Sequence, residues 1–368
     1  MKIRICLVKW VIDIPGGGEK VAISLANELS KNPNFDIHLV GITSESVHPF
    51  FPISDKVRYT NFCCQTPRPK LYRYGLKAAS LLKSYLKRNQ IDIVMSIGIS
   101  TNGIALAATY GTKAKLVVCE HLNGQAENNR MPNIIRRYLG AKLSDMVVTL
   151  TNEDRLYYCQ KYRLSKDKVI CIPNWIEENV TDIAYNPTSK RLITIGRFSK
   201  QKGYDLLARV ASRVLKKNDD WIWDIYGSGD DTIRQSLVNQ LKDAGVLSQV
   251  EFKGVVSGAE NIYPEHGIYV MTSYYEGLPL VLLEAKQFGL PIVSFCCPTG
   301  PADIVENGVN GDLITPFEVE NMVERLNYLM SHQEIREQYS AAAQSGMTRF
   351  NKETVLSQWE SLVTKLKG

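Results

Sequence analysis

The sequence lacks the patterns that would place it at once among metal-binding, disulfide-rich or membrane-spanning proteins. Its eight cysteines form no C-x-x-C motif and have no His partner at metal-ligand spacing, and Cys63-Cys64 and Cys296-Cys297 are adjacent pairs. The longest apolar runs, such as 91–95 and 278–283, are far too short to cross a bilayer. A net charge of +6 is mild and does not by itself indicate a nucleic-acid binder. We therefore expect a cytoplasmic protein with reduced thiols and no nucleic-acid partner.

The stretch at residues 1–18 is also unlike a secretion signal. It has a basic flank, but Lys9 and Asp13 interrupt its apolar part. We interpret it as a first β-strand that runs into a glycine-rich turn.

The length and the hydrophobic pattern predict two domains. A chain of 368 residues exceeds the size of one typical domain. Short Ile- and Val-rich runs alternate with segments of helical length, which predicts parallel sheets with helices on both faces. A stretch rich in proline, acids and asparagine at 173–190 interrupts this rhythm. We expect domains at 1–172 and 191–351 around a linker at 173–190, a cleft between them, and a last helix near 352–368 that packs on the first domain.

Several polar clusters directly follow predicted strands, where ligands of such sheets bind. Gly16-Gly17-Gly18 follows the first strand and opens a helix, so its amides can approach a phosphate closely, although a plain tight turn explains it equally well. Arg197 and Lys202 lie in a loop that suits a diphosphate, although such a loop taken alone is more often solvated surface. His121 ends another strand and is a better site candidate than the other four histidines.

Two glutamates stand in the otherwise apolar segment YYEGLPLVLLEAKQFG. Glu276 and Glu284 are separated by seven residues, and a carboxylate in apolar surroundings is costly unless it is paired or solvated. Gly277-Leu278-Pro279 reads as a helix start, whose free amides and dipole attract an anion. The alternative is that Glu276 only interacts with the positive end of the helix dipole and that Glu284 is an ordinary exposed helix residue. We interpret the pair instead as acceptors for the hydroxyls of one bound molecule.

These motifs together resemble the retaining glycosyltransferases of family 4. The resemblance covers nearly the whole chain and rests on six segments in the expected order: PGGGEKVAISLANEL, CEHLN, IPNWIEE, IGRFSKQKGYDLL, YEGLPLVLLEA and PTGPADIVENGVNGDLI. It implies the GT-B fold, with two Rossmann-like doubly wound α/β domains facing each other across a cleft. It also implies transfer of a hexose or N-acetylhexosamine from a nucleotide-sugar to a saccharide acceptor.

The resemblance implies roles for individual residues. Arg197 and Lys202 match the pair that holds the donor's diphosphate and stabilises the leaving group. Glu276 matches the glutamate that contacts the donor sugar, and His121 matches the histidine near the sugar's C6 end. We expect these four to be catalytic. The other expected donor-binding residues are Glu284 at the ribose, Gly277, Leu278 and Pro279 along the sugar and phosphate, Gly17 and Gly18 in the N-terminal loop, and Gly254 and Val255 facing the base.

The sequence departs from the family in one motif. Trp175 stands where the family more commonly has glycine after Pro-Asn, which affects the local loop geometry. The stretch CPTGPADI resembles bacterial polysaccharide and lipopolysaccharide enzymes that use UDP-sugars more than mannosyltransferases that use GDP. No Asp-x-Asp follows a predicted strand, so we expect no metal site and no cofactor, with the diphosphate neutralised by protein cations.

A basic segment at 66–90 suits an anionic membrane surface. Its cations alternate with Leu and Tyr, and the segment 128–140 is similar in character. A solvated face of an ordinary helix is the alternative. We expect peripheral attachment to the cytoplasmic face of the inner membrane, where a lipid-linked saccharide is the acceptor, with contacts from Arg68, Lys70, Arg73 and Lys77.

Two other functions share parts of this pattern. A nucleotide-sugar 2-epimerase has the same two-domain plan without this combination of Arg/Lys loop and paired glutamates. A non-catalytic nucleotide-sugar-binding protein on an old transferase scaffold would have lost one of Arg197, Lys202, Glu276 and Glu284, and all four are present.

Overall fold

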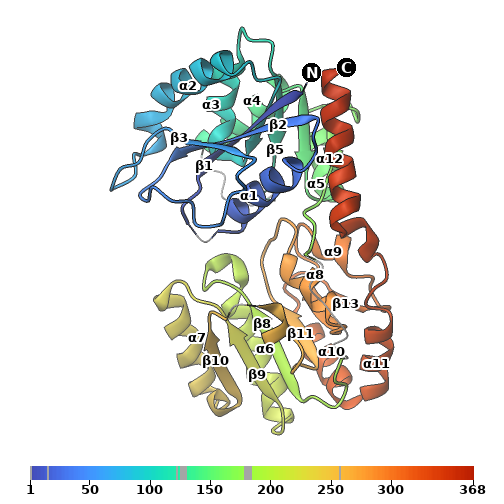
Figure 1. Cartoon of the computed structure of the whole chain (residues 1–368). Helices are drawn as coiled ribbons and strands as arrows, with labels where there is room; N and C mark the ends of the chain where they lie inside the picture. Colours follow the sequence, from blue (N-terminus) through green and yellow to red (C-terminus); the bar gives the residue numbers. More distant parts are fainter. Residues whose placement is uncertain (1, 15, 122, 125–130, 178–184, 257) are drawn as a thin grey trace. The chain divides into compact units, whose positions relative to one another are not determined.

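The computed structural model describes residues 2–14, 16–121, 123–124, 131–177, 185–256 and 258–368 (Figure 1). The chain divides into two compact units, Met1–Asn174 with Glu353–Gly368, and Trp175–Lys352. The sequence placed the first boundary at residue 172, and the structure divides the chain after Asn174. Within the expected linker, residues 178–184 lie outside the described residues.

The described residues of the N-terminal unit form a seven-stranded parallel sheet in the order β3-β2-β1-β4-β5-β6-β7. Its central strands are buried on both faces, which explains why they read as continuous apolar runs. The strands are β1 (Ile3–Val11), β2 (Phe35–Thr43), β3 (Arg58–Asn61), β4 (Ile93–Ile97), β5 (Lys115–Cys119), β6 (Met146–Thr149) and β7 (Val169–Cys171).

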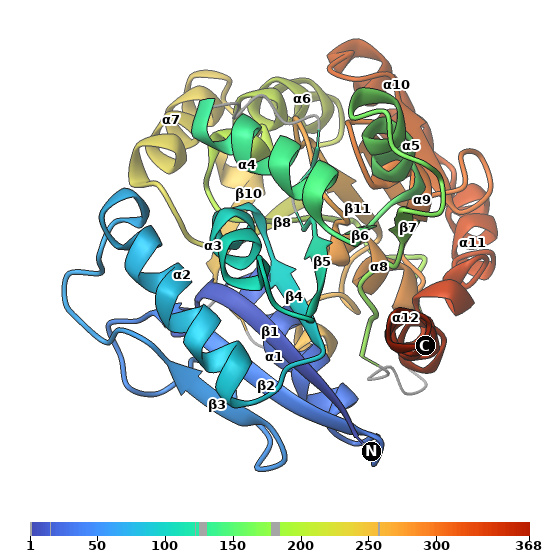
Figure 2. The ribbon, with the colours of Figure 1, turned by 90° about the horizontal axis from the view of Figure 1, so that it is seen from above.

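Helices cover both faces of this sheet. On one face α2, α3 and α4 lie side by side (Figure 2). The last helix of the chain, α12, groups with this unit, where Asn32 donates to Glu360 at 2.9 Å and Lys367 pairs with Asp92 at 2.6 Å. The helices are α1 (Gly17–Leu29), α2 (Leu71–Arg88), α3 (Ile99–Thr109), α4 (Met131–Leu143), α5 (Asn152–Lys161) and α12 (Lys352–Lys367).

The C-terminal unit repeats the plan with a six-stranded parallel sheet in the order β10-β9-β8-β11-β12-β13 among the described residues. Its core lies between the sheet and α6, whose buried stripe includes Leu207, Val210 and Val214. The strands are β8 (Arg191–Ile195), β9 (Ile222–Tyr226), β10 (Val250–Gly254), β11 (Ile268–Met271), β12 (Ile292–Phe295) and β13 (Gly311–Ile314).

The α-helices of the C-terminal unit are α6 (Tyr204–Lys217), α7 (Asp231–Asp243), α8 (Leu280–Gln287), α9 (Pro301–Ile304), α10 (Val319–Ser331) and α11 (Gln333–Ala341). Short 3₁₀ turns occur at Lys200–Lys202, Leu247–Gln249, Ala259–Asn261 and Met347–Phe350.

Two strands were absent from the sequence prediction. β3 and β13 are edge strands of the two sheets, four residues each. Each pairs with a single neighbouring strand, and the sequence RYTN of β3 carries no apolar run. Pairing with β2 and β12 therefore determines both of them, rather than any pattern of their own.

The strand order reverses after the first strand in both sheets. In the N-terminal unit the reversal lies at β1, which pairs with β2 on one side and with β4 on the other. In the C-terminal unit it lies at β8, which pairs with β9 and β11. Loops that leave neighbouring strands in opposite directions open a crevice at the carboxyl ends of the strands, where ligands bind in such folds.

A buried ionic network anchors β8, β9 and the segment before β11. Asp224 accepts hydrogen bonds from Arg191 Nε at 2.6 Å and Nη2 at 2.7 Å, and its Oδ2 lies 2.8 Å from Nε2 of His266. Burial opposes the charge of Asp224, but the hydrogen bonds from His266 and Arg191 outweigh it and lower its pKa to about 2. The charged carboxylate therefore stabilises the C-terminal unit.

We expect Asp224→Asn to lower the free energy of unfolding at pH 7 by about 2–3 kcal/mol. The folded-state pKa of about 2 lies below the usual value of an aspartate, so the contribution is complete above about pH 4 and is lost as the pH falls towards 2. Urea unfolding at pH 7, 4 and 3 measures this. The exposed Asp243→Asn is the control, and a variant as stable as the wild type at pH 7 would contradict the prediction.

Candidate functional site

The loop after β8 presents the two predicted cations differently. The guanidinium of Arg197 is exposed and, among the residues that the structure describes, has no carboxylate partner. Lys202 ends a 3₁₀ turn and is followed by Gly203 at φ +62°. A Cβ on Gly203 would lie 2.1 Å from the carbonyl oxygen of Thr272, so only glycine lets this loop pack against the end of β11.

This close approach brings Lys202 to Glu276. Nζ of Lys202 lies 2.7 Å from Oε1 of Glu276, and their side chains are 21% and 7% exposed. Gln201 adds to the contact, because its Nε2 donates to the carbonyl of Tyr275 at 3.1 Å and lies 3.4 Å from Oε2 of Glu276. The structure thus brings together two residues that lie 74 positions apart in the sequence. The positive charge of Lys202 offsets the negative charge of the buried Glu276.

A second loop holds the backbone of Glu276 from the other side. Its N–H donates to the carbonyl of Pro298 at 3.0 Å, and the N–H and hydroxyl of Thr299 both lie 3.2 Å from its carbonyl oxygen. A Cβ on Gly300 would lie 2.6 Å from the carbonyl of Gly277. The loop after β12 therefore fixes the peptide groups that carry the first glutamate.

The helix predicted at Pro279 begins one residue later. Pro279 has extended backbone angles and is the N-cap of α8, and Leu278 is buried. Glu284 lies in the middle of α8, and Oε2 accepts a 2.7 Å hydrogen bond from the buried hydroxyl of Tyr263. As the sequence predicted, Glu276 precedes the helix that follows β11 and Glu284 lies within that helix.

The predicted base-facing residues lie at the end of an edge strand. Gly254 closes β10 at φ +68°, and nothing lies within 4 Å of a Cβ placed on it. Its carbonyl accepts from Gly227 at 2.7 Å, which ties the loops after β9 and β10 together. Val255 is 74% exposed, an apolar surface beside open space.

In the N-terminal unit the glycine-rich loop has two kinds of glycine. Gly17 begins α1, and a Cβ placed on it would have nothing within 4 Å, which leaves room for a ligand group at the helix N-terminus. A Cβ on Gly18 would lie 2.7 Å from Nζ of Lys9, which is paired with Glu19 at 3.4 Å. Gly18 therefore lies against the end of the side chain of Lys9, a residue that the sequence analysis considered only as an interruption of an apolar stretch.

His121 follows β5 and faces the charge of Lys9. Its Nε2 atom is buried and, within the described part of the chain, has no hydrogen-bond partner. Burial and, secondly, the charge of Lys9 lower the pKa of His121 to about 3. His121 is consequently a neutral imidazole at physiological pH, able to donate or accept a hydrogen bond but not to carry a proton between groups.

A buried arginine holds the loop that carries His121. Arg137 on α4 is 6% exposed and donates to Glu120 at 3.2 Å, to the carbonyl of Gly124 at 3.1 Å and to the carbonyl of Asn123 at 2.9 Å. Tyr158 donates to the same Oε2 of Glu120 at 2.5 Å. Arg137 thus belongs to the interior and not to the basic surface expected of the segment 128–140, of which residues 128–130 lie outside the described residues.

The four predicted membrane contacts do not form one group. Arg68 is bound to Asp13 at 2.9 Å and lies 3.8 Å from Glu45, so its charge is largely neutralised. Lys70 is the N-cap of α2, and Arg73 and Lys77 are exposed on α2, beside Tyr72 and Leu76, which are 72% and 90% exposed. Arg73 and Lys77 therefore remain candidates for contact with a membrane surface, whereas Arg68 is no longer a candidate because its charge is neutralised.

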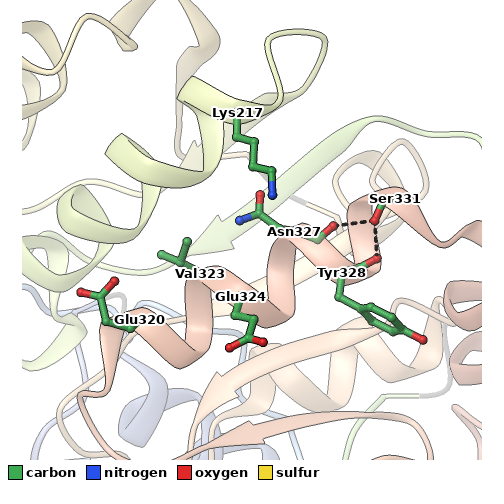
Figure 3. A pocket seen from close by; sticks show the side chains of 7 residues that line it. All are labelled: Lys217, Glu320, Val323, Glu324, Asn327, Tyr328 and Ser331. Atoms are coloured by element: carbon green, nitrogen blue, oxygen red, sulfur yellow. Dashed lines mark hydrogen bonds between the residues drawn. The ribbon is translucent and has the colours of Figure 1, made fainter.

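A pocket of the C-terminal unit lies between α6 and α10 (Figure 3). It measures about 420 Å³ and contains none of the predicted site residues. The ring of Tyr328 is stacked on His332 with centroids 4.1 Å apart, and the guanidinium of Arg325 lies 4.7 Å from the ring centroid. The pocket is lined by Lys217, Glu320, Val323, Glu324, Asn327, Tyr328 and Ser331.

The described residues hold neither a metal-binding cluster nor a helix that could span a membrane. Within them, no group of three or more His, Cys, Asp or Glu side chains is arranged to hold a metal ion. In the same part of the chain, no helix combines the length and apolar character needed to cross a bilayer.

His121 should not titrate between pH 5 and 8, because its pKa of about 3 lies below that range. We expect its imidazole C–H resonances to stay constant from pH 5 to 8 in NMR spectra assigned with His121→Gln. A blocked histidine model peptide in the same buffers is the control and should titrate with a midpoint near about 6.5. A midpoint for His121 close to that of the model peptide would contradict the prediction.

Curated relatives match this chain over nearly its full length. An uncharacterized glycosyltransferase of Haemophilus influenzae is 28% identical, with 95% of this chain and 96% of that protein covered. The amylovoran biosynthesis glycosyltransferase AmsD of Erwinia amylovora is 26% identical, with coverage of 95% and 96%. In Campylobacter jejuni, an N-acetyl-D-galactosaminyltransferase named for an undecaprenol-linked acceptor is 23% identical, with coverage of 96% and 96%.

Solved structures show the same fold at low sequence identity. HepE of Anabaena, crystallised with UDP, has a TM-score of 0.79 and 17% identity over 99% of this chain and 100% of that chain. Sucrose-phosphate synthase of Thermosynechococcus elongatus has a TM-score of 0.84 and 14% identity over 99% of both chains. These likenesses assign the two parallel-sheet units to the GT-B fold.

Two family models match consecutive parts of the sequence. Residues 15–180 match the family described as Glycosyltransferase Family 4, and residues 176–346 match Glycosyl transferases group 1. Together they account for both units and for the loops that carry Arg197, Lys202, Glu276 and Glu284. The chain belongs to the family 4 glycosyltransferases of the GT-B fold, alongside relatives that act in polysaccharide biosynthesis.

Proposed function

We propose that this glycosyltransferase moves a hexose or N-acetylhexosamine from a UDP-sugar to a lipid-linked saccharide with retention of anomeric configuration. The reaction belongs to cell-surface polysaccharide or lipopolysaccharide synthesis. The observation that carries the proposal is the ion pair of Lys202 and Glu276 where β8 and β11 end, with the exposed Arg197 on the same loop as Lys202.

The charges of this site suit a diphosphate leaving group. A donor diphosphate would replace Glu276 as the partner of Lys202 and would accept two parallel hydrogen bonds from Arg197. Glu276 would then be released to accept from the sugar hydroxyls. The acceptor hydroxyl attacks from the face that the diphosphate leaves, and the leaving phosphate takes its proton. No metal ion is assigned to this step, because Arg197 and Lys202 supply the positive charge at the developing anion.

Glu284 supports recognition of the nucleotide. It lies on α8, eight residues after Glu276, and a carboxylate there suits the paired hydroxyls of a ribose. Uridine is preferred over guanosine because the stretch CPTGPADI resembles that of UDP-sugar enzymes and because the Anabaena protein of the same fold was crystallised with UDP. The acceptor class follows the Campylobacter relative, whose name gives an undecaprenol-linked saccharide.

The two alternatives are less favoured. An epimerase would convert its nucleotide-sugar without an acceptor, and the full-length relatives described above carry transferase names. A binding protein without activity would not need the intact set of two cations and two carboxylates. Release of UDP or GDP from a panel of donors, measured with and without lipid-linked acceptors, separates these functions from the proposed one.

Arg197→Ala should lower kcat by about 10²–10³, equivalent to about 3–4 kcal/mol, because one preorganised charge at the leaving group is lost. Nucleotide release in the presence of EDTA measures the change. Arg213→Ala, which removes an exposed arginine of α6 that pairs with Glu320, is the control and should keep the wild-type rate. A rate in EDTA that survives Arg197→Ala would overturn the proposed mechanism.

We further propose that α2, α3 and α4 form a surface that rests on anionic lipid. These adjacent helices contain no Asp or Glu. The helix α4 differs from an ordinary surface helix, because it buries Arg137, Gly140 and Ala141 and exposes a stripe of larger apolar side chains. The exposed members of this stripe are Met131, Ile135, Tyr138, Leu139 and Leu143.

An apolar stripe among cations fits a membrane better than it fits water. Ile135 is 50% exposed and Leu143 is 65% exposed, and such contiguous apolar surface marks an interaction site. The exposed cations of α2, Arg73 and Lys77 among them, would meet the lipid phosphates. Surface attachment would bring the enzyme to a lipid-linked acceptor.

Ile135→Glu combined with Leu139→Glu should weaken binding to phosphatidylglycerol vesicles by about 10-fold or more, because two apolar side chains leave the lipid. Vesicle co-sedimentation at low salt measures the partition. Leu156→Glu is the matched control, since Leu156 is 51% exposed on α5, outside the three helices. Equal recovery of the wild type in the supernatant with and without vesicles would refute the membrane contact.

A further inference from the structure

The second glutamate of the site is oriented by a buried tyrosine. The hydroxyl of Tyr263 lies 2.7 Å from Oε2 of Glu284 and 3.3 Å from the carbonyl oxygen of Val281, one turn earlier on α8. A hydroxyl has one proton, so the shorter, charge-assisted bond to the carboxylate takes it. One oxygen of Glu284 is thereby fixed relative to the helix that carries it.

Tyr263 is itself rigidly held. Its side chain is 0% exposed, and its ring is stacked on Phe288 with centroids 5.3 Å apart and lies near Tyr269 at 6.3 Å. Burial and, secondly, the charge of Glu284 raise the pKa of Tyr263 well above its usual value. The hydroxyl therefore stays protonated, and remains a donor, at any pH at which the protein is folded and active.

A glutamate on a helix surface ordinarily samples several rotamers, and ordering it on binding costs free energy. The bond from Tyr263 removes most of that freedom in advance. Glu284 is only partly buried, so a ligand can reach this part of α8. The bond from Tyr263 restrains the orientation of the carboxylate before a ligand binds.

We propose that Tyr263 is a positioning residue that pre-orients Glu284 towards the ribose hydroxyls of the donor nucleotide. This inference rests on the proposed donor site. Tyr263 would strengthen binding only of ligands that have ribose hydroxyls, because its effect passes through Glu284. Sequence reasoning did not single out Tyr263, since it lies 21 residues before Glu284 in a segment without a motif.

The test measures nucleotide binding by calorimetry with UDP, GDP and their 2′,3′-dideoxy analogues. Tyr263→Phe deletes one oxygen and keeps the stacked ring. We expect it to weaken binding of the preferred ribonucleotide by about 5- to 20-fold, and that of its dideoxy analogue by less than about 2-fold. Tyr269→Phe is the matched control, because it deletes a buried hydroxyl from the same cluster that donates to Ile195 at 3.4 Å, and it should leave both affinities unchanged.

Glu284→Ala distinguishes failure of the inference from failure of the proposed function. If wild-type protein binds neither UDP nor GDP, or if Glu284→Ala leaves the preference for the ribonucleotide intact, the proposed donor site is wrong and the role of Tyr263 falls with it. If Glu284→Ala abolishes that preference while Tyr263→Phe weakens both ligands equally or neither, the donor site stands and Tyr263 is only structural. Melting temperatures of all variants establish that the folded protein is compared.

Discussion

The reversal of strand order in an all-parallel sheet is the constraint on which the candidate donor site depends. Because β8 and β11 are neighbours at this reversal, the loops that follow them lead in opposite directions, and the first residues of the two loops lie side by side. The two loops are so close that residue 203 cannot carry a side chain, because a Cβ there would lie 2.1 Å from the carbonyl oxygen of Thr272. Glycine at this position, at φ +62°, is what allows Lys202 to reach Glu276.

The site is built so that each buried charge has a partner within the same unit. Glu276 is 6% exposed and is neutralised by Lys202, while its peptide groups are held by Pro298 and Thr299. Glu284 is held by the neutral hydroxyl of Tyr263. A buried carboxylate without such partners would be costly. Under the proposed function, a diphosphate would take the place of Glu276 at Lys202, and the released carboxylate would accept hydrogen bonds from the sugar hydroxyls.

In the N-terminal unit, the two faces of α4 have different surroundings. The buried face carries Arg137, which donates hydrogen bonds to the loop that contains His121, and the exposed face is apolar. This inversion of the usual pattern makes sense if the outer face meets lipid and the inner face orders a polar loop. Burial, together with the charge of Lys9, lowers the pKa of His121 and keeps it neutral, and the end of the Lys9 side chain lies against Gly18.

The sequence by itself determined the alternation of strands and helices and the two-unit plan, because these depend on local periodicity. Motifs of fixed spacing also singled out Arg197, Lys202, Glu276 and Glu284 as candidates for the site. It did not find β3 and β13, whose pairing comes from other strands of their sheets. Only the tertiary structure decided that Arg68 is neutralised by Asp13, that Arg137 is buried, that the charge of Lys9 acts on His121, and that Tyr263 donates to Glu284. Each of these depends on a contact between side chains far apart in the chain, which spacing along one sequence does not encode.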